Sequence, residues 1–115
     1  MQDAPTTGER LTRTLEAHGL AVRTLVSHHY DESRIVVDIE GGAQIRIADN
    51  QGMVDGWTED HTGWTAFYRP QGERSDEGER RIYVSADSRP AFERDTAALV
   101  AAVVQCAAAR RLAPA

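Results

Sequence analysis

The spacing of the apolar residues changes near residue 85, and this change limits the possible folds more than any other feature of the sequence. Upstream of it, apolar residues recur at every second position, as at Ile35, Val37 and Ile39. Downstream they recur at steps of three and four residues: Phe92, Leu99, Val100, Val103, Val104 and Ala107. A period of two is typical of strands and a period of 3.6 is typical of a helix. The sequence therefore predicts a run of strands closed by a long helix.

Two helices and five strands are expected along the chain. The first helix covers residues 7–18 and begins with a capping box, because Glu9 follows Thr6 by three residues. The last helix is capped by Ser88, holds Pro90 in its first turn and runs to residue 111. The strands are expected at residues 20–29, 34–40, 44–49, 63–69 and 81–85.

The pairing of the second and third strands follows from the loop between them, which contains two adjacent glycines. A two-residue turn would set Ile39 against Gln44 and mix apolar with polar side chains. A three-residue turn pairs Ile39 with Ile45 and Val37 with Ile47, which keeps the apolar residues on one face. The sequence favours the three-residue turn.

These elements predict one α+β domain that covers residues 1–115. The order is α-β-β-β-β-β-α, and the short loops favour a mainly antiparallel five-stranded sheet. Amphipathic helices bury their apolar sides against a sheet. We therefore expect a two-layer sandwich with both terminal helices on one face.

Composition narrows the class of protein. The net charge of −5 disfavours nucleic acid as a partner, because phosphate binding needs a positive surface. All 13 basic side chains are arginine, a bias typical of GC-rich genomes such as those of actinobacteria. The alternative is an arginine set selected for forked contacts with carboxylate or phosphate. The sequence shows no secretory signal and no apolar run long enough for a membrane span, so a cytoplasmic protein is expected.

Few residues carry recognisable chemistry. His28 and His29, with Asp31 and Glu32, are metal candidates, but adjacent strand residues point to opposite faces and a solvated turn is favoured. The single cysteine, Cys106, permits no internal disulfide and is typical of a small core residue. The sequence contains no nucleophile elbow, phosphate loop or dinucleotide motif. We therefore predict no catalytic residue, no metal and no cofactor.

The aromatic residues of the last two strands admit two arrangements. In one, Trp64, Tyr68 and Tyr83 lie on the outer face of the sheet, where an aromatic patch usually marks a binding surface. In the other, Trp64 and Tyr68 are buried and Phe67 faces outward. Burial of two large rings slightly favours the second arrangement.

The sequence favours a small, acidic, non-enzymatic protein-interaction module, such as an adaptor or a chaperone-like or immunity-like protein. It would bind a protein partner or a second copy through the outer sheet face or the alanine-rich last helix. The alternative is a small-ligand pocket between sheet and helices, with Trp57, His61 and Trp64 at its mouth. The predicted binding residues are Trp57, His61, Trp64, Tyr68 and Tyr83.

Overall fold

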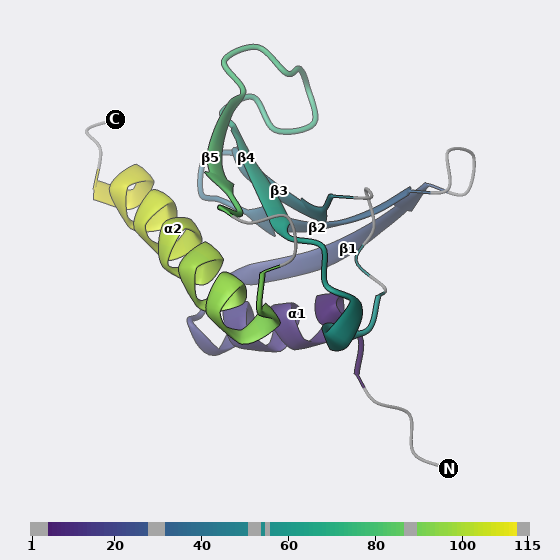
Figure 1. The fold of residues 1–115 in the computed structure, drawn as a ribbon. Helices are drawn as coiled ribbons and strands as arrows, with labels where there is room; N and C mark the ends of the chain where they lie inside the picture. The colour runs from purple at the N-terminus through teal and green to yellow at the C-terminus, as the bar shows by residue number, and fades with distance from the viewer. Residues whose placement is uncertain (1–4, 28–31, 51–53, 55, 87–89, 113–115) are drawn as a thin grey trace.

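The computed structural model describes residues 5–27, 32–50, 54, 56–86 and 90–112 and confirms the predicted α+β order. Both long helices lie on the same side of a five-stranded sheet (Figure 1). The elements are α1 (Thr7–Ala17), β1 (Ala21–Ser27), β2 (Glu32–Asp38), β3 (Gln44–Asp49), the short 3₁₀ helix η1 (Thr58–Asp60), β4 (Trp64–Arg69), β5 (Arg80–Val84) and α2 (Phe92–Leu112). The predicted cap of the last helix, Ser88, lies outside the described residues.

The sheet is a simple meander. Its strand order is β1-β2-β3-β4-β5, and each strand pairs antiparallel with the next. The face beneath the helices holds the fully buried residues Ile35, Val37, Ile45, Ile47 and Trp64. Leu11 and Leu15 of α1 and Leu99 and Val103 of α2 complete this core. Alternation along the strands therefore places the apolar layer where the sequence predicts it.

The predicted pairing of β2 with β3 was wrong by two residues. Val37 lies opposite Ile45, and Ile35 lies opposite Ile47. The loop begins one residue earlier than expected, since the backbone of Ile39 already bonds to that of Ala43 at 2.8 Å. A shift of two residues keeps every side chain on its face, because the side-chain period is also two. The apolar pattern therefore could not distinguish the two registers.

A β-bulge in β5 turns Tyr83 towards the core. One of the two arrangements considered from the sequence placed Tyr83 on the outer face. Instead Tyr83 pairs with Ala66 and Arg81 pairs with Phe67, so Ile82 is the extra residue. Such a bulge allows Ile82 and Tyr83 to pack against the core together. Val84 is consequently 46% exposed.

The first turn of α1 packs closely against the segment before η1, and Gly8 is essential to this contact. The N–H of Gly8 donates to the carbonyl oxygen of Val54 at 2.8 Å. A Cβ atom at position 8 would lie 2.3 Å from that oxygen.

Replacing Gly8 with alanine is therefore expected to destabilise the protein, although the same change in an open helix stabilises by about 1 kcal/mol. Forcing the two backbones apart should lower the free energy of unfolding by roughly 1–3 kcal/mol. Urea denaturation measures the change. Glu16→Ala, at an exposed position of α1, is the control and should shift stability by no more than about 0.5 kcal/mol. A stabilised Gly8→Ala protein would contradict the contact.

Candidate functional site

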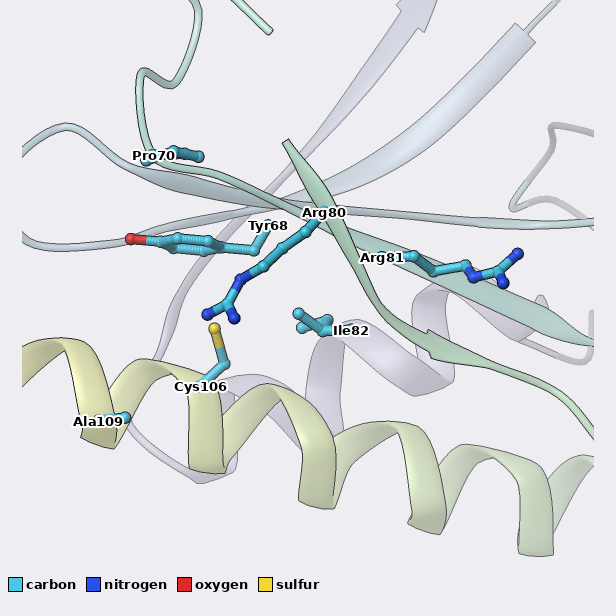
Figure 2. Close-up of a pocket in the computed structure, with 7 residues that line it drawn as sticks. All are labelled: Tyr68, Pro70, Arg80, Arg81, Ile82, Cys106 and Ala109. Atoms are coloured by element: carbon cyan, nitrogen blue, oxygen red, sulfur yellow. The ribbon is translucent and has the colours of Figure 1, made fainter. Parts of the chain in front are cut away.

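The five predicted binding residues do not form one surface. Trp57 is 47% exposed beside η1. His61, Trp64 and Tyr83 converge beneath the start of α2. Tyr68 lies at the other end of β4, facing the second half of α2 (Figure 2). The second arrangement of the aromatic residues is therefore the observed one: Trp64 and Tyr68 lie on the helix side, and no outward patch of Trp64, Tyr68 and Tyr83 forms.

Asp95 of α2 is the centre of a buried polar cluster. Its carboxylate accepts hydrogen bonds from the backbone N–H of Trp64 at 3.1 Å and from Ser85 Oγ at 2.7 Å. His61 Nε2 lies 2.7 Å from Asp95 Oδ2, and the Tyr83 hydroxyl donates to Asp95 Oδ1. The side chains of His61 and Asp95 are only 1% and 2% exposed. One carboxylate thus ties α2 to β4, β5 and the loop after η1.

The cluster contains a serine, a histidine and an aspartate, but not in the arrangement of a catalytic triad. In a triad the serine hydroxyl bonds to the imidazole, and the imidazole bonds to the carboxylate. Here Ser85 and His61 both bond to Asp95 directly. Four donors around one buried carboxylate stabilise the packing of α2 on the sheet.

The Tyr83 hydroxyl gives this cluster a pH dependence. Burial, the hydrogen bond to Asp95 and the charge of Asp95 raise the pKa of Tyr83 from 10.0 to about 12. The folded protein therefore keeps this proton at a pH at which the unfolded chain has lost it. The stability that Tyr83 contributes is present below pH 10 and is lost as the pH rises towards 12.

We expect a spectrophotometric titration of the native protein to show one tyrosine that ionises well above pH 10. The Tyr83→Phe variant should lack this late step. Its stability should also fall less steeply between pH 10 and pH 12. Ionisation of every tyrosine near pH 10, while the protein is still folded, would contradict the position of Tyr83.

A pocket of about 570 Å³ opens between the start of β5 and the second half of α2 (Figure 2). Arg80 and Cys106 point into the space between the strand and the helix, whereas Arg81 points away (Figure 2). The guanidinium of Arg80 lies 5.3 Å from the centre of the Tyr68 ring. Burial raises the pKa of the Cys106 thiol, which keeps it protonated. This pocket lies between sheet and helix, as one alternative predicted, but Trp57, His61 and Trp64 do not line it.

The face of the sheet opposite the helices is rich in arginine. We call it the arginine face and define it by the outward-pointing strand residues Arg23, Arg34, Arg46, Arg69 and Arg81. One row crosses all five strands and alternates cationic with apolar side chains: Arg23, Val36, Arg46, Phe67 and Arg81. These residues are distant in the sequence, and only the sheet brings them together.

The arginines of this face differ in their partners. Arg23 forms ion pairs with Asp38 at 2.8 Å and Glu73 at 2.9 Å. Arg69 pairs with Glu79 at 3.5 Å.

Arg46, at the centre of the arginine face, has a neutral partner. Its Nε and Nη2 atoms both lie 3.3 Å from the amide oxygen of Gln44, and no described carboxylate comes within ion-pair distance. Burial lowers the pKa of the Arg46 guanidinium, and the charges of Arg69 and Arg34 lower it further.

A shallow pocket of about 310 Å³ adjoins Arg46 on the arginine face. Arg34, Ala48, Thr65 and Phe67 are among the residues that line it. The Phe67 side chain is 36% exposed there. The pocket is thus lined by an aromatic residue, two arginines and the acidic residue Asp49.

Other sites considered from the sequence receive no support. Of the metal candidates, His28, His29 and Asp31 lie outside the described residues. Within the described part of the chain, no group of three or more His, Cys, Asp or Glu side chains is placed to hold a metal ion. Among those same residues, no helix has the length and apolar character of a membrane span. No family model matches the chain, and neither a curated protein nor a solved structure matches it significantly.

Proposed function

We propose that this protein is a non-enzymatic protein-interaction module that binds its partner through the arginine face. The observation that carries this proposal is the exposure of apolar side chains among the arginines. Phe67 is 36% exposed and Val84 is 46% exposed on the face that neither helix covers. Aromatic residues and arginine are the residue types enriched at protein interfaces and at their energetic hot spots.

The last helix is the weaker of the two proposed surfaces. Its exposed positions include Ala97, Ala98, Ala101 and Gln105. Such small side chains offer little area to bury and no charge to pair, and alanine is also the best helix former. A module of this kind would act as an adaptor or in a chaperone-like or immunity-like role. The all-arginine composition favours a bacterium with a GC-rich genome as its source, and we propose the cytoplasm as its setting.

Site-specific photo-crosslinking in the native host tests this proposal. The photoreactive residue p-benzoylphenylalanine would replace Phe67 on the arginine face or, as the matched control, Ala98 on α2. We expect a discrete protein adduct from the first position and none from the second. An adduct from Ala98 alone would move the binding surface to the last helix, and adducts from neither would contradict the proposal.

The pocket in Figure 2 supports a second candidate, a small-ligand-binding domain. The supporting observation is the Arg80 guanidinium above the Tyr68 ring at the wall of a pocket of about 570 Å³. This volume lies within the range of ligand pockets. A cation beside an aromatic ring suits an anionic ligand with a flat apolar part. A small molecule that copurifies with the protein, and is lost in Tyr68→Ala, would favour this candidate.

A further inference from the structure

We propose that Arg46 anchors a carboxylate from an acidic segment of the partner protein, while an apolar side chain of the same segment lies on Phe67. This inference depends on the proposed function, because it names the chemistry of the partner that the arginine face would bind. The expected partner segment has Asp or Glu close in sequence to an apolar residue.

The position of Arg46 supports its role as an anchor. It lies on the central strand β3, with Val36 on one side and Phe67 on the other. Val36 is 0% exposed although it points away from the helices. Arginine side chains cover apolar neighbours with their methylene stems, and Arg23 and Arg46 flank Val36 in the register. This register allows the stem of Arg46 to cover Val36, and the guanidinium lies beside Gln44 on the same strand.

The hydrogen bonds of Arg46 are incomplete. A guanidinium carries five N–H donors, and two of its nitrogens share the single amide oxygen of Gln44. The nearby acidic side chains of Glu73 and Glu79 are already paired with Arg23 and Arg69. An external carboxylate would give Arg46 a charge-assisted, forked partner that the described protein residues do not provide.

The adjoining pocket limits the size of the side chains that can bind beside Arg46. Its volume of about 310 Å³ is at the lower limit for ligand pockets, and it is open to solvent. It therefore suits one or two side chains of a docked segment. Phe67 supplies the apolar wall, and Arg34, Arg46 and the acidic residue Asp49 are also among the lining residues.

Charge complementarity favours a protein segment over nucleic acid. The arginine face is locally positive, but the whole chain carries a net charge of −5. Nucleic acid presents a long array of phosphates, which this overall charge repels. A short segment with one or two carboxylates interacts mainly with the nearby arginines of the arginine face.

Peptide selection followed by fluorescence anisotropy tests the proposal. The full-length protein would select binders from a random peptide display library, and labelled peptides would be titrated with wild type, Arg46→Gln and Arg46→Lys. We expect the selected peptides to pair Asp or Glu with an apolar residue. Arg46→Gln should weaken their binding by about tenfold or more, since a charged hydrogen bond is lost. Arg46→Lys should keep only part of the wild-type affinity, because lysine keeps the charge but lacks the forked guanidinium.

The matched control is Arg13→Gln, which makes the same charge change at an exposed position of α1 and should leave affinity unchanged. Circular dichroism would show that each variant is folded. Selected peptides without acidic residues, peptides that bind Arg46→Gln as tightly as wild type, or no selected peptide at all would overturn the proposal. So would tighter binding to a single-stranded oligonucleotide, or a wild-type dimer that Arg46→Gln converts to a monomer.

These failures are distinguishable from failure of the proposed function. Crosslinking at Phe67 reports whether the arginine face contacts a protein, whatever the chemistry of that protein. A Phe67 adduct with no effect of Arg46→Gln would leave the interaction module in place and remove only the acidic partner.

Discussion

Replacing Asp95 with alanine is expected to lower the free energy of unfolding by about 3–5 kcal/mol, because several buried hydrogen-bond donors lose the acceptor they share. The change removes the acceptor shared by His61 Nε2 and the hydroxyls of Ser85 and Tyr83, whereas the Trp64 backbone N–H keeps Ser85 Oγ as an acceptor at 2.6 Å. Buried donors without a partner keep the full cost of leaving water. Urea denaturation at neutral pH measures the loss.

Glu93→Ala is the matched control for this prediction. Glu93 lies two residues before Asp95 on α2 and pairs with Arg10 at 2.6 Å, but its side chain is 75% exposed. Exposed ion pairs contribute at most about 1 kcal/mol. A loss for Asp95→Ala no larger than that for Glu93→Ala would show that the cluster does not hold α2 on the sheet.

Replacing Trp64 with alanine should cost a similar amount, about 3–5 kcal/mol, because it empties a large fully buried site. The indole ring is 0% exposed and packs against His61 and Phe92, with ring centres 4.9 Å and 6.4 Å away. Its Nε1–H donates to Thr96 Oγ1 at 2.9 Å. Thermal and urea unfolding would both report the loss.

Trp57→Ala makes the same chemical change at a residue that is 47% exposed. Its effect should stay within about 0.5 kcal/mol. Equal losses for the two tryptophan variants would contradict the burial of Trp64. Because Trp64 and Asp95 share the same cluster, the double variant is expected to lose less than the sum of the single losses.

The fold could be predicted because its signals are periodic. Alternation at Ile35, Val37 and Ile39 marks the buried side of a strand, and the capping box at Thr6 and Glu9 marks the start of a helix. Features that do not disturb the period could not be predicted. The bulge at Ile82 is of this kind, since no residue around it is a bulge marker such as glycine.

The buried cluster has a sequence signal that was overlooked. Asp95 precedes Leu99 by four residues and Val103 by eight, so the three share one face of α2. All three are buried. An acidic residue in the apolar stripe of a helix needs buried partners, and this was the available indication that Asp95 is central. The identity of those partners could not be predicted, because they come from distant parts of the chain.

The arginine face was partly visible in the sequence. Alternation alone sets Arg34, Arg46 and Arg81 opposite the apolar side of their strands. Arginine was interpreted first as the composition bias of a GC-rich genome, because all 13 basic side chains are arginine. The clustering exists only across strands, in the row from Arg23 to Arg81. Its recognition required the observed register.

The central claim is that Trp64 and Tyr68 of β4 lie beneath the helices, and that the opposite face of the sheet carries the arginines. The most direct test is the fluorescence of the Trp57→Phe variant, in which Trp64 is the remaining tryptophan. We predict a blue-shifted emission that acrylamide barely quenches, whereas Trp64→Phe should show the red-shifted, readily quenched emission of Trp57. An accessible Trp64 would reverse the faces of the sheet, bury Arg46 and contradict the account.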